Sequence, residues 1–577
     1  MAERADSPIG FVVGGGLRGG LHLRLNVPPS RLKEGAFVVA RVPATETEPE
    51  WSFYGLITDL YLDATQQRLA REPASERFGE TLARLLHGQT LFAMAEMTPV
   101  LMQSTAPPSD PTRASAWQED ASRKPMPVKS IPPHHTPVFL ATQMDIDAIF
   151  GQPDAAGRFF TLGYTPEQGH AVRIDLAKFV RRPAGVFGAT GAGKSFLTRL
   201  LMAGLIKYGQ SSLLVFDMHN EYGFDIQDPD KDTRTRVIGL KSKFPAQVRV
   251  VALGPGTLIH GHHQPHYHLV IPTSAVQPED ILLLSRELNL RETTPTILDA
   301  LVRDFGPEAW FRAFRDLEPG KRETIVDENG KERTVPAEDS VEGWARRNNI
   351  HEGAALALHS KLRRLFHRPY LVDDPAQDTL DILIRDLEEG RHIILSFGDY
   401  ETDLDYLFVT NLLTRRIREH WVERTNQFRS KQGSEPRPLV VVVEEAHKLL
   451  NREMAAQTTF NILAREMRKY YVTLLIVDQR PSQIDDEVMS QLGTRISGWL
   501  GDEDDIRAVL AGLAGRDALR GMLARLQLGE EVLVMGYGVP MPIVLRSRRY
   551  DETFWKELLA EHEDPTRVTE ALDVFDV

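Results

Sequence analysis

The sequence contains no cysteine and no long apolar run, and these two absences exclude several kinds of protein. Without a thiol, the chain cannot build a disulfide framework, a thiolate nucleophile, a cysteine-ligated zinc site or a cysteine-bound iron–sulfur cluster. No apolar stretch approaches the ~18 residues that a membrane-spanning helix needs, and the start, MAERADSPIG, lacks the basic and then apolar order of a signal peptide. The sequence therefore predicts a cytoplasmic protein without a membrane partner.

The sequence also has fewer basic than acidic residues. The 577 residues include 68 Lys and Arg against 81 Asp and Glu, which gives a formal net charge of -13. This balance argues against a protein that coats nucleic acid with its whole surface, but it allows a local basic groove or pore. The length corresponds to about three or four domains.

The first part of the chain has the pattern of a small β-barrel. Short apolar or alternating runs such as Phe37–Val42 and Phe53–Leu62 lie between Gly and Pro clusters, which is typical of all-β domains. We therefore expect a closed barrel in residues 1–137. Within it, the stretch 103–135 is rich in Pro, Ser, Ala and Thr, and it predicts a flexible linker or a long barrel loop with too little apolar surface to order itself.

Beyond the Pro-rich stretch, apolar strands alternate with amphipathic helices. Residues 138–275 and 372–549 together predict an α/β fold with a parallel sheet. Between them, residues 276–371 predict an inserted helical bundle, and residues 550–577 form a C-terminal tail. The expected helices of the insertion are Pro278–Leu288, Thr296–Phe305, Glu308–Leu317 and Val341–Phe366, the last interrupted near Asn348.

The strongest motif is a phosphate-binding loop (P-loop). The segment GATGAGKS, from Gly188 to Ser195, matches G-x-x-x-x-G-K-[ST] between an apolar strand and a helical run. Its glycines let backbone N–H groups face phosphates, Lys194 reaches the terminal phosphates and Ser195 coordinates Mg²⁺. A glycine-rich turn that binds nothing is the alternative. The residues expected to contact the nucleotide are Gly188, Ala189, Thr190, Gly191, Ala192, Gly193, Lys194, Ser195 and Phe196.

A second strand end supplies carboxylates. The run Leu439–Val443 predicts a strand buried on both faces, and Glu444 and Glu445 follow at its C-terminal end, where ligands bind in open parallel sheets. Glu444 is expected to hold Mg²⁺, directly or through water, and Glu445 to orient and polarise the attacking water. The alternative is a solvated helix start, where the helix dipole favours acidic residues.

Three more side chains are candidates for catalysis. Gln479 follows the apolar strand Val472–Val477 and would position the water or contact the γ-phosphate, unless it only begins a turn. Arg465 and Arg468 are three residues apart, so we expect them on one helix. Either one would neutralise transition-state charge in its own site or in a neighbour's, although most helical arginines are solvated or salt-bridged.

Two further clusters each allow two roles. Asp217, His219 and Glu221 follow the strand after the P-loop, where they would couple the sheet edge to an inter-subunit contact or serve as ordinary turn residues. The segment His260–His268 would place several imidazoles on one strand face for a metal ion. No carboxylate pattern accompanies it, and we expect an exposed hairpin.

In their order along the chain, these motifs resemble the HerA family of hexameric ATPases, of the bacterial type, within the HerA/FtsK group. The resemblance is carried by GATGAGKS, LVVVVEEAH, AREMRK, the strand ending in DQRP, and SQLGTR, and it covers about Phe187–Arg549. The β-rich start is similar to the HAS-type barrel of that family. The stretch Asp217–Tyr222 is similar to D-x-H-G-E-Y with Asn220 in place of Gly, and Glu444 stands where Asp is more common.

The resemblance implies a RecA-like P-loop ATPase core and an ATP- and Mg²⁺-dependent translocase or helicase on double-stranded DNA. It further implies a homohexamer whose partner is a NurA-like nuclease or another effector, in DNA end resection or antiphage defence. The alternatives are a nucleotide-gated scaffold that activates an effector nuclease and a conjugation- or secretion-type ATPase. A ring concentrates basic loops in its pore, so an acidic chain is compatible with DNA. Candidate basic segments are Lys241–Lys243 and Lys361–Arg364.

Overall fold

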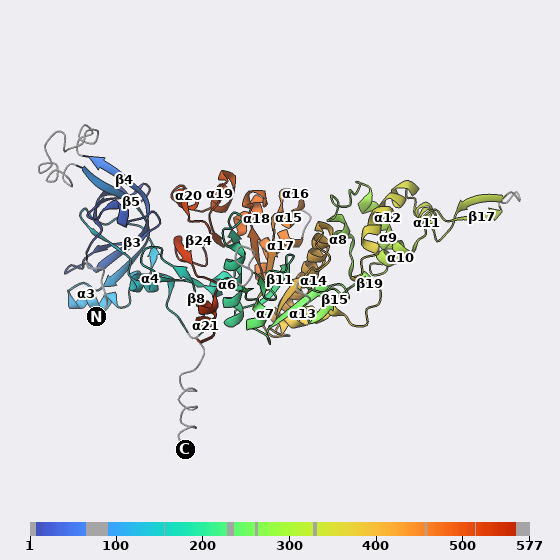
Figure 1. The fold of residues 1–577 in the computed structure, drawn as a ribbon, viewed down its shortest axis with the longest axis horizontal. Helices are drawn as coiled ribbons and strands as arrows, with labels where there is room; N and C mark the ends of the chain where they lie inside the picture. The colour runs from blue at the N-terminus through green and yellow to red at the C-terminus, as the bar shows by residue number, and fades with distance from the viewer. Residues whose placement is uncertain are drawn as a thin grey trace, which may run out of the picture.

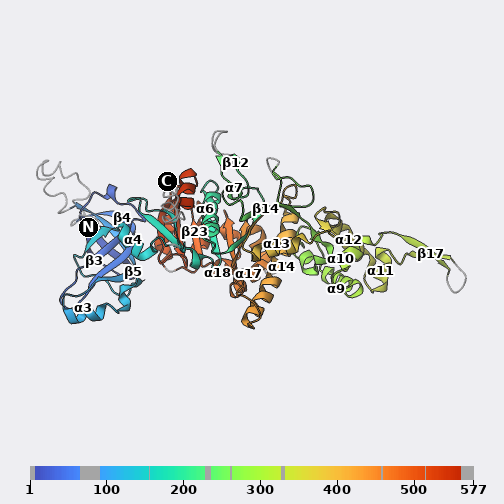
Figure 2. The same cartoon turned by 90° about the horizontal axis from the view of Figure 1, so that it is seen from below.

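The protein is elongated, with a β-barrel at one end, a large mixed sheet in the middle, and a helical region with a projecting hairpin at the other end (Figures 1 and 2). The computed structural model describes residues 7–64, 91–154, 156–227, 236–259, 263–326, 332–455, 459–513 and 515–560. None of the helices in these ranges combines the length and apolarity required to cross a bilayer.

The barrel expected near the N-terminus is present. Six strands close on themselves in the order β2-β1-β7-β3-β4-β5, because β5 pairs back with β2, and β6 adds to β5 outside the ring. The barrel core is lined by residues such as Leu23, Val38, Ile57 and Met97, which are almost fully buried. The strands are β1 (Gly10–Gly16), β2 (Gly20–Leu25), β3 (Phe37–Val42), β4 (Glu50–Ala64), β5 (Leu91–Ala106), β6 (Met126–Pro127) and β7 (Pro137–Leu140).

The Pro-rich stretch 103–135 is a long loop of the barrel, which is the second of the two forms that the sequence predicts. It begins within β5 and contains α3 (Pro111–Trp117), whose first N–H groups are capped by Asp110. The Trp117 Nε1 donates a hydrogen bond to Ser104 Oγ at 2.5 Å, and Gln103 Nε2 donates to the Arg123 carbonyl at 2.7 Å. Capping and hydrogen bonds to the barrel therefore order a segment that has little apolar surface.

The central sheet has the strand order β15-β14-β20-β11-β21-β22-β10-β23-β24-β25-β8-β9. It is parallel from β15 to β23 and antiparallel from there to β9. Its strands are β8 (Phe159–Tyr164), β9 (Ala171–Asp175), β10 (Ala184–Phe187), β11 (Ser212–Asp217), β14 (Val248–Leu253), β15 (Tyr267–Leu269), β20 (His392–Ser396), β21 (Leu439–Glu444), β22 (Val472–Asp478), β23 (Thr494–Ser497), β24 (Glu531–Gly536) and β25 (Ile543–Ser547). The parallel part confirms the α/β core.

Helices connect the strands of this sheet and pack against it, and a 27-residue helix, α14, is the longest of those described. They are α4 (Gln143–Phe150), α5 (Leu176–Phe179), α6 (Lys194–Lys207), α7 (Leu240–Lys243), α13 (Thr379–Glu388), α14 (Asp403–Arg429), α15 (His447–Leu450), α16 (Arg452–Ala455), α17 (Thr459–Glu466), α18 (Asp486–Gln491), α19 (Glu503–Leu510), α20 (Arg516–Arg525) and α21 (Glu552–Ala560).

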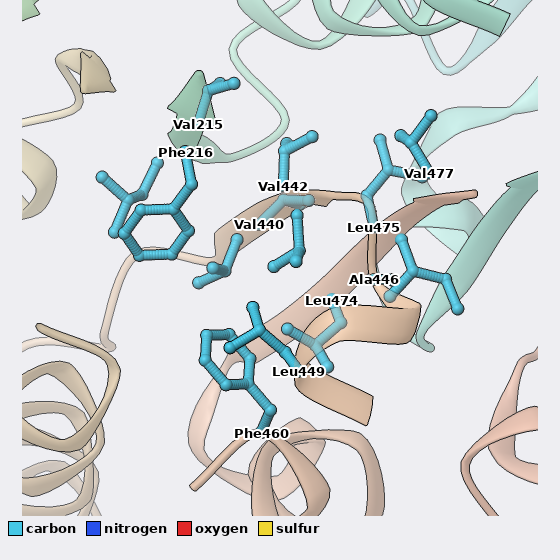
Figure 3. Close-up of a cluster of buried hydrophobic side chains, with 14 of the residues drawn as sticks. Val215, Phe216, Val440, Val442, Ala446, Leu449, Phe460, Leu474, Leu475 and Val477 are labelled. Atoms are coloured by element: carbon cyan, nitrogen blue, oxygen red, sulfur yellow. The ribbon is translucent and has the colours of Figure 1, made fainter. Parts of the chain in front are cut away.

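The centre of the sheet is held by apolar packing. Figure 3 shows side chains of β11, β21 and β22 gathered with Leu449 of α15 and Phe460 of α17. The Phe216 and Phe460 rings meet edge to face with centroids 6.4 Å apart. Burying one Val, Leu or Phe side chain contributes about 1.5–3 kcal/mol. The strand ends that carry polar side chains are therefore fixed by a rigid apolar layer beneath them.

The region between β16 (Ile271–Pro272) and β19 (Leu371–Val372) contains most of the expected helices. They are α8 (Pro278–Leu282), α9 (Thr294–Phe305), α10 (Trp310–Asp316), α11 (Val341–Arg347) and α12 (Glu352–Phe366). The first is shorter than expected, and a hairpin of β17 (Arg322–Val326) and β18 (Glu332–Pro336) interrupts the series and projects from it (Figure 1). The domain boundaries stay a prediction.

Candidate active site

The P-loop lies between β10 and α6, as the motif predicts. Gly188, Gly191 and Gly193 have φ values of +152°, +78° and +80°. A Cβ on Gly188 would also lie 2.9 Å from the Ala192 Cβ, so a larger residue would distort the turn. Gly193 is the N-cap of α6 and offers no side-chain cap, so the first N–H groups of the helix are left for a ligand.

Lys194 reaches back across this loop. Its Nζ donates hydrogen bonds to the carbonyls of Gly188 and Ala189, both at 2.9 Å. Partial burial lowers the pKa of the Lys194 ammonium, and the nearby Glu445 and Asp478 carboxylates oppose that shift. The lysine therefore sits over the face of the loop from which its N–H groups would meet phosphates. Ser195 begins the same helix, next to it.

The sheet register places the acidic end of β21 two strands away from the P-loop. β22 separates β21 from β10, with Glu444 beside Val477 and Phe187 beside Asp478. The buried Glu444 accepts a hydrogen bond from the Tyr222 hydroxyl through Oε1. Its Oε2 is buried and has no hydrogen-bond partner among the described residues. Burial, reinforced by the Asp217 carboxyl, raises the pKa of Glu444 well above its ordinary value.

A chain of hydrogen bonds joins the P-loop to Glu445. Thr190 Oγ1 donates to Gln479 Oε1 at 2.8 Å, and Gln479 Nε2 donates to Glu445 Oε1 at 3.2 Å. Glu445 has a φ of +46°, a left-handed conformation that is unfavourable for a side chain of this kind. Three segments that are distant in sequence thus meet at one sheet edge, and Gln479 contacts the site instead of only beginning a turn.

His447 and Asp478 complete this edge, and the sequence analysis assigned neither a role. Asp478 Oδ2 accepts hydrogen bonds from the His447 backbone N–H at 2.7 Å and lies 3.0 Å from His447 Nδ1. The same Nδ1 is 3.5 Å from Glu445 Oε2. The bond to Asp478 raises the pKa of the His447 imidazole. His447 belongs to the motif EEAH and Asp478 to the motif DQRP, each at the end of an apolar strand. Placing these two strands side by side in the sheet would have predicted the contact.

The segment after β11 forms a buried turn. Asp217 accepts backbone N–H bonds from Glu221 at 2.8 Å and from Tyr222 at 3.0 Å, and burial raises the pKa of Asp217 to about 6. This turn positions the Tyr222 hydroxyl so that it donates its hydrogen bond to Glu444. Asn220, with a φ of +56°, takes the left-handed position where the family pattern has Gly. His219 is exposed.

The two candidate arginines are placed differently from the expectation. Arg465 lies in α17 and pairs with Glu487 of α18 at 3.0 Å. Arg468 lies beyond the end of α17, in the 3₁₀ turn Met467–Tyr470, and is exposed. The expectation that both share one helix is therefore wrong, because the helix ends at Glu466. Within the described part of the chain, neither arginine is hydrogen-bonded to the P-loop.

The histidine-rich segment does not gather around a common point. His266 contacts the backbone of Val250 and the Lys241 ammonium, and His268 contacts the Thr257 carbonyl at 3.1 Å. In the described ranges, no group of three or more His, Asp and Glu side chains is arranged to hold a metal ion. His263 stacks on the Phe224 ring with centroids 4.4 Å apart, and histidines 260 and 262 lie outside the described ranges.

The basic segments are partly used inside the fold. Lys241 donates to the carbonyls of Pro245 at 2.6 Å and Val248 at 3.1 Å. Lys361 donates to the Asn289 carbonyl, and Arg364 donates to that of Glu287 at 2.7 Å. Within these candidate segments, Arg363 is exposed, whereas Lys243 is partly buried with its ammonium 5.8 Å from the centroid of the Trp555 ring.

Comparison with known proteins agrees with this arrangement. The family model "Helicase HerA, central domain" matches residues 160–417, which span β8, the P-loop and most of α14. The DNA double-strand break repair helicase HerA of Pyrococcus furiosus is 24% identical over 403 residues, covering 66% of this chain and 68% of that protein. Its counterpart from Sulfolobus acidocaldarius is 24% identical over 420 residues, covering 72% and 73%.

Among solved structures, VirB4 of Thermoanaerobacter pseudethanolicus aligns with a TM-score of 0.42 and 17% identity, covering 70% of this chain and 99% of that chain. The P-loop, the family match and the curated relatives all indicate the same kind of protein. The chain has a P-loop ATPase fold, and over its central part it is similar to the HerA helicase family.

Proposed function

We propose that this chain hydrolyses ATP and couples hydrolysis to movement along double-stranded DNA. The observation that carries the proposal is the hydrogen-bonded chain Thr190–Gln479–Glu445, which links the phosphate-binding loop to a strand-end carboxylate. DNA as the substrate is supported by the relatives, which are named as DNA double-strand break repair helicases.

The residues present fit ATP and Mg²⁺. A Cβ on Gly191 would meet nothing within 4 Å, so the loop is open to a ligand on that side. The Ser195 hydroxyl and the unpartnered Oε2 of Glu444 are the hard oxygen donors that Mg²⁺ prefers, together with phosphate oxygens and water. When bound, Mg²⁺ would neutralise charge that develops on the terminal phosphates.

Each of the protein's own residues at the site then has a separate role. Glu445 accepts a proton from the attacking water and orients it, and Gln479 fixes the direction of that carboxylate. Lys194 exchanges its two loop carbonyls for phosphate oxygens. Tyr222 holds one oxygen of Glu444, so that the other oxygen is left for the metal.

Assembly into a homohexamer follows the resemblance to HerA. Arg465 and Arg468 are both exposed, which suits a guanidinium that acts in a neighbouring subunit's site. The net charge of -13 would then belong to the outside of the ring, with basic side chains facing DNA in the pore. A NurA-like nuclease or another effector would be the partner, in end resection or in antiphage defence.

The test is steady-state ATPase activity of the assembled particle with and without long duplex DNA. A translocase is expected to hydrolyse ATP faster on DNA, and an assembled hexamer whose rate is unchanged by DNA would contradict the proposal. The Glu445→Gln variant separates the motor from the scaffold alternative. A motor stalls in this variant, whereas a scaffold still activates its effector with ATP bound.

A further inference from the structure

His447 lies against the carboxylate that the proposed function assigns to the chemistry. It is the first residue of α15, two positions after Glu445, and its Nδ1 is 3.5 Å from Glu445 Oε2. We propose that His447 is a positioning residue for ATP hydrolysis, which fixes the orientation of the Glu445 carboxylate through Nδ1. The inference rests on the proposed function, because it concerns how the same carboxylate is held.

Asp478 determines which nitrogen of the His447 ring carries a hydrogen. The Asp478 side chain is buried, and it accepts backbone N–H bonds from His447 and from Arg480, both at 2.7 Å. Its Oδ2 is also 3.0 Å from His447 Nδ1. Because an ionised carboxylate only accepts hydrogen bonds, Nδ1 must be a protonated nitrogen at this distance. The Nδ1–H group therefore has two carboxylate neighbours, Asp478 Oδ2 and, farther away, Glu445 Oε2.

The Glu445 carboxylate needs a contact besides Gln479 to have one orientation. Gln479 Nε2 donates to Oε1 at 3.2 Å, and the terminal torsion of a glutamate side chain has a broad energy minimum. One donor therefore fixes one oxygen and leaves the carboxylate able to turn about that bond. With His447 beside Oε2, each oxygen faces a donor and keeps a second lone pair for the attacking water. A base held in this way presents a fixed geometry to the water.

The backbone around Glu445 is anchored independently of the imidazole. Ala446 is buried in the apolar layer of Figure 3, and the Lys448 N–H donates to the Glu445 carbonyl at 2.8 Å. The short bond from the His447 N–H to Asp478 also involves only the backbone of His447. Replacing the imidazole therefore removes a contact to the Glu445 carboxylate, while the turn that carries Glu445 keeps these anchors.

The His447 ring can be reached from outside the protein. Its Nε2 makes no hydrogen bond to a described residue, and its side chain is 19% exposed. His447 is in the wall of a pocket of about 1010 Å³, together with Ser482 and Gln483. An imidazole molecule is far smaller than this volume, so imidazole added to the solution can reach the place of a deleted His447 ring.

The experiment separates the Nδ1 position from the rest of the ring. In His447→Asn the amide nitrogen takes the place of Nδ1, whereas in His447→Gln it takes the place of Nε2. We measure kcat, KM for ATP and Tm for these variants, for His447→Ala, and for His134→Ala, a control that removes an exposed imidazole before β7. We expect the Ala and Gln variants of His447 to lower kcat about tenfold with KM nearly constant, and the Asn variant to stay within about threefold of the wild type. The control should behave as the wild type.

Addition of free imidazole is the second measurement. It should restore part of the lost kcat in His447→Ala and none in Gln479→Ala, which lacks an amide donor at a different place. The recovery is partial because the untethered ring must be held by binding alone.

Each result has a defined meaning. If His447→Ala keeps the wild-type kcat, or if the Asn and Gln variants lose it equally, His447 does not position Glu445. A fall in kcat that only follows a fall in Tm across the variants makes the role structural and also overturns the inference. If His447→Ala does not fold, the comparison of the Asn and Gln variants decides. A wild-type protein that does not hydrolyse ATP contradicts the proposed function itself, which is a separate result.

Discussion

The polar side chains on the two sides of the P-loop differ in how many contacts they make within the protein. Toward β21 and β22, the polar side chains hold one another, as in the chain Thr190–Gln479–Glu445. Toward β25, the guanidinium groups of Arg546 and Arg549 are exposed and nearly unpaired. Bond breaking requires a fixed geometry, whereas recognition of a ligand tolerates side chains that settle only on contact. Substitutions on the two sides should therefore have different kinetic signatures.

The largest effect is expected for Glu445→Gln. Removing the proton acceptor while keeping the side chain's shape should lower kcat about 10²- to 10⁴-fold and leave ATP binding in place. Steady-state hydrolysis and calorimetric binding are measured together. The matched control is Glu332→Gln on the exposed strand β18, which should behave as the wild type. A variant that retains most of its kcat would remove Glu445 from the chemistry.

A smaller loss is expected for Gln479→Ala, which breaks the hydrogen-bonded chain in the middle. Loss of one positioning hydrogen bond should lower kcat about tenfold with KM nearly constant. Gln432→Ala, at an exposed position after α14, serves as the control. If KM changes and kcat does not, the glutamine contacts the substrate in its ground state, and the proposed contrast between the two sides is lost.

Arg549→Ala probes the opposite side. Because the guanidinium is solvated before the ligand arrives, its loss should raise KM for ATP about threefold and leave kcat unchanged. Initial rates over a range of ATP concentrations measure both parameters. A fall in kcat at constant KM would place Arg549 with the chemistry instead.

The smallest effect concerns pH and His447. Its pKa is raised in the folded protein by Asp478, so the folded state binds this proton more tightly than the unfolded chain does. The contribution to stability is complete below the unfolded pKa of about 6.5 and is lost as pH rises through the raised value. Chemical denaturation at several pH values should show this decline in the wild type, and His447→Asn should lack it. Parallel profiles would mean that the His447–Asp478 contact does not contribute to stability.

The sequence predicts the elements that carry their own pattern. Apolar runs before polar residues located β21 and β22 to within one residue, and the glycine spacing located the P-loop. Contacts between such elements were not accessible in the same way. That Asp478 binds His447 depends on the adjacency of β21 and β22, which no local signal states.

Other features depend on few polar contacts and escape pattern analysis for that reason. The Pro-rich loop is ordered by the Asp110 cap and the Trp117–Ser104 bond, neither of which changes hydrophobicity along the chain. The end of α17 at Glu466 separates Arg465 from Arg468, although their spacing suits one helix. Element type is therefore predictable here where burial dictates it, and less so where single hydrogen bonds do.

The strand order of the central sheet also determines when the sheet can form during synthesis. The hairpin β8–β9 precedes the P-loop in sequence, yet among the described strands it pairs with the rest of the sheet through β25, where Arg546 is opposite Tyr164. During synthesis, this hairpin cannot pair with β25 until nearly the whole chain has been made. Such distant pairing slows folding and leaves strand edges open meanwhile. A ribosome-bound chain that stops before residue 543 therefore contains the P-loop but has no finished sheet around it.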